Sequence, residues 1–145
     1  MSSNRSIGVN FEKRFCELLR DNGFWVLQIP QNSYGQPADV IAVKNDRPYL
    51  IDCKVCSRDS FTKGRIEPNQ KTSMEMWERI SLNRPAWFAL YLLRSDEVYM
   101  IPYPLITQLF NNESLLSKDK IVEHGIEIRK WLEQHDNRDS KRNYD

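Results

Sequence analysis

Apolar positions in the first part of the chain recur first at helical and then at strand spacing. The helical set shares one face: Phe11, Phe15, Leu18 and Leu19. This pattern predicts a helix over residues 10–21, with Gly23 just past its end as a stop signal. Residues 24–29 (FWVLQI) then predict a strand, and the turn-forming residues 30–37 predict a loop.

Residues 37–55 (PADVIAVKNDRPYLIDCKV) predict two apolar strands joined by a short turn. Asparagine and aspartate at 45–46 tolerate positive φ, so this dipeptide is the predicted turn of a hairpin. In that register Lys44 pairs with Arg47, and Pro48 falls at a non-hydrogen-bonded pair where its missing N–H leaves no gap. Both faces of the hairpin are largely apolar, so we expect helices to cover both.

The same register brings three charged side chains together within this apolar stretch. Asp39 lies directly opposite Asp52, and Lys54 shares their face because residues two apart on a strand point the same way. Two close carboxylates repel each other unless a cation lies between them, and Mg²⁺ prefers oxygen ligands. With a lysine to position water or to stabilise charge on a phosphate, the cluster indicates metal-assisted phosphodiester hydrolysis. The alternative is a salt-bridged trio without catalysis.

The second half of the chain predicts a helix, two strands and further short elements. The predicted segments are a helix over 69–83, strands over 86–93 and 97–102, and a short helix over 104–110. Beyond residue 117, Gly125 separates a short helix from a second element, and residues 136–145 predict a disordered tail. The order of elements predicts an α/β fold, a mixed central β-sheet flanked by helices on both faces, in a single domain over residues 1–135.

Composition limits the classes of function. The 145 residues are 40% hydrophobic and 28% charged, which is typical of one globular domain. A net charge of +1 excludes a blanket polycation, so any nucleic-acid site must be a local patch. The chain has no long apolar run or signal-peptide pattern, and its three cysteines cannot form a complete disulfide framework. We therefore expect a reduced, cytoplasmic protein with no membrane partner.

Together these motifs resemble the PD-(D/E)xK nuclease superfamily. Pro37-Ala38-Asp39 is similar to its first half-motif, and Asp52-Cys53-Lys54 to its second. Within the superfamily the chain most resembles the Holliday junction resolvases of archaeal and RecU type. Three further features carry this resemblance, which covers about residues 7–110: Glu12 in GVNFEKRF, Gln70 opening the helix after the lysine strand, and the strand pair over 86–102. The chain departs from the usual pattern at Ala38, which separates Pro from Asp, and at Asp52, where resolvases usually have Glu.

The resemblance implies a restriction-endonuclease-like core and a metal-dependent DNA endonuclease that resolves four-way junctions in recombination and repair. Asp39, Asp52 and the main-chain carbonyl of Cys53 would bind Mg²⁺, with Mn²⁺ able to substitute. Glu12 would complete the metal site, directly or through water. The partner would be branched DNA, and the enzyme would act as a homodimer because two opposed strands must be cut.

Other roles follow from the same resemblance. Lys54 would orient or activate the attacking water, and Gln70 would support Lys54 or the water. Candidate DNA contacts lie in the loops flanking the metal motif: Ser33, Arg58, Lys63 and Arg65. The alternatives are an ordinary turn-forming serine and a solvated basic loop.

Two other classes of function stay open at this stage. The second class is a restriction-like or repair nuclease of the superfamily that the chain resembles, acting on duplex, flap or single-stranded DNA. A third class is a nuclease-like DNA-binding or structural module without catalysis. Cys53 and Cys56 lack a second pair at zinc spacing, and His124 and His135 lie outside the matched region. The tryptophans of periodic elements are predicted to be core residues: Trp25, Trp77 and Trp87.

Overall fold

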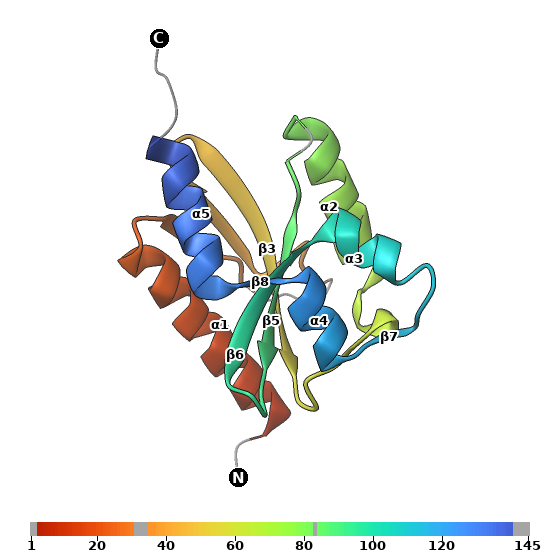
Figure 1. The fold of residues 1–145 in the computed structure, drawn as a ribbon. Coiled ribbons are helices and arrows are strands. Elements are labelled where there is room, and N and C mark those ends of the chain that lie inside the picture. The colour runs from red at the N-terminus through yellow and green to blue at the C-terminus, as the bar shows by residue number, and fades with distance from the viewer. Residues whose placement is uncertain (1–2, 31–34, 83, 141–145) are drawn as a thin grey trace.

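A six-stranded sheet forms the centre of the computed structural model, which describes residues 3–30, 35–82 and 84–140 (Figure 1). Its strand order is β1-β2-β3-β5-β6-β8. The strands are β1 (Trp25–Gln28), β2 (Val40–Lys44), β3 (Arg47–Cys56), β5 (Trp87–Leu92), β6 (Glu97–Pro102) and β8 (Ile126–Glu127). Neighbouring strands pair antiparallel apart from β3 and β5, which run parallel. The predicted mixed sheet is confirmed.

Helices cover both faces of this sheet, as predicted (Figure 1). The helices are α1 (Asn4–Asp21), α2 (Pro68–Ile80), α3 (Tyr103–Leu109), α4 (Lys118–His124) and α5 (Ile128–Ser140). Helices α1 and α5 pack on one face around residues such as Phe15 and Trp131. Helices α2, α3 and α4 pack on the other face around Met74, Ile106 and Ile121. A short 3₁₀ helix, η1 (Lys63–Arg65), and a small sheet of β4 (Phe61–Thr62) and β7 (Leu115–Leu116) complete the second layer.

The β2–β3 hairpin has the predicted turn and register. Asn45 and Asp46 adopt φ values of 50° and 66°, the left-handed conformation that a tight two-residue hairpin turn requires. Lys44 pairs with Arg47, as predicted. Along this hairpin, alternate residues point to the α1–α5 cluster and to the α2–α4 cluster, which is why both of its faces are apolar.

The predicted pairing fails at one position, Asp39. Its N–H donates to the carbonyl of Ile51 over 3.2 Å, although Ile51 already pairs with Val40. Two residues on one strand therefore oppose one on the other, which is a β-bulge. Asp39 is consequently not directly opposite Asp52, and the bulge turns it toward α1.

Several element ends and one burial prediction also differ. Helix α1 begins at Asn4, earlier than predicted, because the Ser3 hydroxyl caps it by accepting the Ser6 N–H. Helix α5 continues through Ser140 in place of a tail from residue 136, and residues 141–145 lie outside the described part. The prediction that Trp25 is a core residue is wrong, since its side chain is 61% exposed.

The exposure of Trp25 follows from its place on the edge strand β1. Its neighbour Val26 packs against the α1–α5 cluster, so Trp25 and Leu27 point to the opposite side, where they remain exposed. The other two tryptophans fit the prediction better, because Trp87 is buried and Trp77 packs against the α2–α4 cluster. No helix in the described ranges is both long and apolar enough to cross a membrane.

Candidate active site

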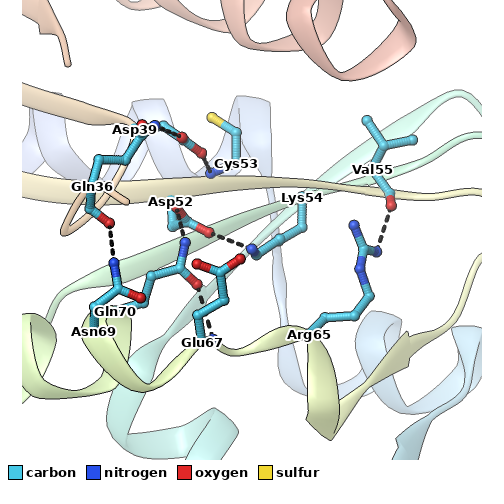
Figure 2. A network of polar contacts seen from close by, with 10 residues as sticks. All are labelled: Gln36, Asp39, Asp52, Cys53, Lys54, Val55, Arg65, Glu67, Asn69 and Gln70. Carbon is cyan, nitrogen blue, oxygen red and sulfur yellow. Dashed lines mark hydrogen bonds and ion pairs between the residues drawn. The ribbon is translucent and has the colours of Figure 1, made fainter. Parts of the chain in front are cut away.

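A cavity of about 1040 Å³ opens beside β3, between the first half of α1 and the start of α2. Four of the predicted catalytic residues line it: Glu12, Asp39, Lys54 and Gln70. Asp52 lies beneath this lining and is fully buried. The structure therefore brings all five predicted catalytic side chains to one place, and Figure 2 shows four of them, Asp39, Asp52, Lys54 and Gln70.

Asp39 is held by hydrogen bonds to both of its carboxylate oxygens. The Gln36 side-chain amide donates to Oδ1 over 2.8 Å, and the Cys53 main-chain N–H donates to Oδ2 over 2.8 Å. A carboxylate has about four lone-pair sites, so each oxygen keeps one for another partner. Figure 2 shows Asp39 and Asp52 on either side of the β3 ribbon. This is the arrangement that the bulge produces.

Asp52 is the most deeply buried acid of the cluster. Its Oδ1 accepts a hydrogen bond from the Gln70 side-chain amide over 3.0 Å. Its Oδ2 lies 3.2 Å from the Lys54 ammonium, yet makes no hydrogen bond within the described ranges. Burial, and next the negative charge of Asp39, raise the pKa of Asp52 well above its ordinary value, while Lys54 acts in the opposite direction.

Glu12 adds a third carboxylate from α1. Its Oε1 accepts a hydrogen bond from the Gln28 side chain over 3.1 Å. Burial and the negative charge of Asp39 raise the pKa of Glu12, and the Gln28 hydrogen bond partly offsets them. Asp39 therefore repels both Glu12 and Asp52, and the Lys54 ammonium is paired with Asp52 (Figure 2).

The donor set fits a hard divalent cation. Asp52 Oδ2 is a buried oxygen that makes no hydrogen bond to the residues described, and a cation beside it would also relieve its repulsion with Asp39. Among the residues described, no three His, Cys, Asp or Glu side chains form a ready metal cluster. A metal ion here would therefore need oxygen ligands beyond these side chains, with the two aspartates as the nearest acids to each other and Glu12 beside Asp39.

Comparison with known proteins decides the family. A sequence profile described as "Archaeal holliday junction resolvase (hjc)" matches residues 3–140. The chain belongs to the archaeal Holliday junction resolvase family. The predicted resemblance to these resolvases is confirmed, and the profile match extends past residues 7–110 at both ends.

Relatives of this resolvase family agree with that assignment. The chain is 40% identical over 60 residues to the "Crossover junction endodeoxyribonuclease" of Sulfolobus islandicus rod-shaped virus 1, covering 40% of this chain and 50% of the viral protein. The match thus spans about half the length of that relative. It is 24% identical over 133 residues to the "Crossover junction endodeoxyribonuclease Hje" of Saccharolobus islandicus (strain REY15A), covering 86% of this chain and 95% of that protein. Both names support a junction-resolving endonuclease.

A solved structure shares the resolvase fold. The Hjc Holliday junction resolvase of Archaeoglobus fulgidus superposes with a TM-score of 0.66 at 18% sequence identity. The match covers 86% of this chain and 99% of that one. At this identity the likeness concerns the fold, and it confirms the predicted restriction-endonuclease-like core.

Three of the four predicted DNA-contact residues of this resolvase are described by the structure, and two of them line the cavity. Arg58 and Arg65 line the cavity. Arg65 also donates to the Val55 carbonyl over 2.6 Å, which fixes its guanidinium beside β3. Lys63 lies in η1 and is not among the described residues that line the cavity. Ser33 falls within residues 31–34, outside the described part of the chain.

Sequence reasoning missed the contact that one predicted residue makes, and it missed three other residues of the resolvase site altogether. Gln70 contacts Asp52, whereas the sequence analysis assigned it to Lys54 or to the water. Gln28 and Gln36, which bond Glu12 and Asp39, lie in a strand end and a loop and carry no motif. Arg5 also lines the cavity. It was missed because the predicted helix began at residue 10, whereas α1 begins at Asn4.

No catalytic role was predicted for the cysteine side chains or for His135, and the structure gives them structural roles. The three cysteines, all within the described ranges, form no disulfide, and Cys53 packs against the α1–α5 cluster as a small core residue. His135 is buried on α5, with its Nδ1 2.7 Å from the Tyr49 hydroxyl and its ring against Trp131. His135 thus joins α5 to β3, away from the cavity.

Proposed function

We propose that the protein is a metal-dependent endodeoxyribonuclease that resolves four-way DNA junctions by hydrolysing phosphodiester bonds. One observation carries the chemistry: beneath the lining of an open cavity, the buried Asp52 has one oxygen that makes no hydrogen bond to any described residue, beside Lys54 and close to Asp39. Burying incompletely paired charges lowers the stability of the folded protein, and a bound cation and a phosphate would offset that cost. Membership of the resolvase family supports the junction as substrate.

The metal, for which we propose Mg²⁺ with Mn²⁺ as a substitute, would be held by Asp39, Asp52 and the Cys53 carbonyl. The bulge supports this set, because it joins the Asp39 side chain to the Cys53 backbone through a hydrogen bond. Glu12 would complete the site through water. When bound, the ion supplies a Lewis acid for the phosphoryl oxygen and for the attacking water.

The remaining groups hold and orient the reactants. The Lys54 ammonium borders the cavity, so it can donate hydrogen bonds to the attacking water or to a phosphoryl oxygen. In the hydrolysis the water oxygen bonds to phosphorus, the bond from phosphorus to the 3′ oxygen breaks, and a proton ends on that oxygen. The products are a 5′-phosphate and a 3′-hydroxyl.

DNA would reach the cavity over its basic rim. Arg5, Arg58 and Arg65 line it and are exposed, which supports contacts with phosphates on either side of the scissile bond. Lys63 and Ser33 are further candidates for contacts with DNA. A homodimer acting in the cytoplasm would place two such cavities against the two opposed strands of a junction.

The test uses labelled four-way junction, flap, linear duplex and single-stranded DNA with Mg²⁺ or Mn²⁺. We expect paired, symmetric nicks confined to the junction. Equal cutting of plain duplex would instead favour a restriction-like or repair nuclease, and binding without any cutting would favour an inactive DNA-binding module.

A lysine pair makes this test specific to the site. Lys54→Ala should abolish cleavage while leaving junction binding largely intact, because the ammonium acts on the water or the phosphate. Lys120→Ala is the matched control, since Lys120 also lies near an acid, 3.7 Å from Glu113, but on α4. Undiminished cleavage by Lys54→Ala would overturn the proposed mechanism.

A further inference from the structure

Each of the two aspartates of the site is paired with one glutamine amide. The Gln36 Nε2 donates to Asp39 Oδ1, and the Gln70 Nε2 donates to Asp52 Oδ1. Both glutamines are buried, with 9% and 5% of their surfaces exposed. A buried amide that donates to a carboxylate selects one orientation of that carboxylate, since turning the acid would leave the donor unpaired.

Both glutamines are in turn held by the first turn of α2, residues 67–70, which fixes the side chain of Gln70 and the main chain of Gln36 (Figure 2). Gln70 Oε1 accepts the Glu67 main-chain N–H over 3.3 Å, as one half of a capping box. Because its oxygen is used by the cap, only the Gln70 nitrogen is left to face Asp52. On the neighbouring position, Asn69 Nδ2 donates to the Gln36 main-chain carbonyl over 2.9 Å.

We propose that this first turn of α2 is the positioning element of the metal site. Asn69 acts on Asp39 through Gln36, and the Glu67–Gln70 cap acts on Asp52 through the Gln70 amide. The inference rests on the proposed function, because it assigns these residues to the orientation of two metal ligands. One rigid helix end therefore sets the separation of two repelling acids that belong to opposite sides of β3.

The backbone conformation at Gly35 agrees with a positioning role for Asn69. Gly35 adopts φ +81°, and a Cβ there would lie 2.9 Å from Asn69 Nδ2. A larger residue would therefore displace the Asn69 side chain from the Gln36 carbonyl. Glycine at 35 leaves room for the contact between the loop and the helix.

The decisive experiment measures Mn²⁺ binding by calorimetry, without DNA, for the whole chain and for Asn69→Ala. Alanine leaves the Gln36 carbonyl without this donor, so a merely structural role for Asn69 predicts at most a loss of thermal stability, with no change in the Mn²⁺ affinity of the folded protein. Positioning predicts Mn²⁺ binding weaker by about 10- to 100-fold, as found for residues that orient metal ligands. Cleavage should need correspondingly more Mn²⁺ and should recover at saturation.

Thr72→Ala on the same helix is the matched control, because its exposed hydroxyl donates to the Pro68 carbonyl within α2. Gly35→Ala gives an independent approach, and we expect it to weaken Mn²⁺ binding as Asn69→Ala does. In the Asn69→Ala background Gly35→Ala should add little, because the displaced group is already gone.

The outcomes separate this inference from the proposed function. Wild-type protein that binds Mn²⁺, together with Asn69→Ala protein that binds it equally well, overturns the positioning role alone. Wild-type protein that neither binds Mn²⁺ nor cleaves a junction overturns the proposed function, and the positioning role with it. Weaker binding by Asn69→Ala and Gly35→Ala but not by Thr72→Ala supports both.

Discussion

Two buried aspartates lie close together along the chain and have opposite surroundings. Asp59, in the turn after β3, accepts the Arg94 main-chain N–H over 2.9 Å and the Ser95 hydroxyl. These contacts tie the turn after β3 to the turn between β5 and β6. Asp52, within β3, receives one amide hydrogen bond from the part of the chain that is described, pairs with Lys54 and faces another acid.

The difference shows that burial alone does not mark a functional acid. Asp59 is 6% exposed and Asp52 is 0% exposed, so both are removed from water. Asp59 has donors for both oxygens and stabilises the loop that it joins. Within the described ranges, one Asp52 oxygen makes no hydrogen bond and has the Lys54 ammonium as its ion-pair partner, and such incomplete pairing beside a second acid indicates room for a cation from outside the chain.

The largest expected effect concerns cleavage. Asp52→Asn should reduce junction cleavage on the order of a thousandfold, because it removes a metal ligand worth several kcal/mol. Asp59→Asn is the matched variant, and it should cleave like the wild type. Single-turnover assays at saturating Mg²⁺ measure both, and an equal loss in the two variants would contradict the distinction between them.

The order should reverse for stability without divalent ions. Asp59→Ala leaves the Arg94 N–H and the Ser95 hydroxyl without their acceptor, so the free energy of unfolding should fall by about 1–3 kcal/mol. Asp52→Asn removes a buried charge and its repulsion with Asp39, so it should keep or raise that free energy. Urea denaturation in EDTA gives both values. A stability loss in Asp52→Asn larger than that in Asp59→Ala would count against this prediction.

The pH dependence of stability should carry the sign of a raised pKa. Burial, and next Asp39, raise the pKa of Asp52 well above 3.8, so the folded protein keeps a proton that the unfolded chain releases. The contribution of Asp52 is therefore complete below about pH 3.8 and is lost as the pH rises through the raised pKa. The stability difference between wild type and Asp52→Asn, measured in EDTA across pH, should show this decline. A difference that grows in favour of the wild type as the pH rises would contradict it.

The smallest expected effect sharpens the description of Asp59. Ser95→Ala removes one of its two donors and leaves the Arg94 N–H in place, so stability should fall by about 0.5–1.5 kcal/mol. Cleavage should not change, because Ser95 is not among the described residues that line the cavity. Urea denaturation and a junction assay on the same preparation check both parts.

The hairpin at the centre of the site could be predicted because its determinants are local. Turn residues at 45–46 and the two-residue period fixed the pairing of Lys44 with Arg47, and with it the approach of Asp52 and Lys54. The order of the main elements followed from apolar periodicity in the same way. Local chemistry of this kind is readable from sequence.

The rest depends on contacts between distant segments. The bulge at Asp39 adds one residue against Ile51, and no local signal distinguishes it from a regular strand end. Gln36 lies in a loop of turn formers, and only the arrival of α2 gives it a partner. Trp25 looked like a core residue because periodicity does not reveal which strand lies at the edge of the sheet.

The exposed indole of Trp25 gives the protein its own optical reporter. Trp87 and Trp131 are buried, so quenching by acrylamide in the free chain should report chiefly on Trp25, with the half-buried Trp77 as a minor contributor. A second copy or a DNA arm that covers β1 should protect this fluorescence and shift its emission to shorter wavelength. Association at the edge of the sheet can therefore be followed without a label.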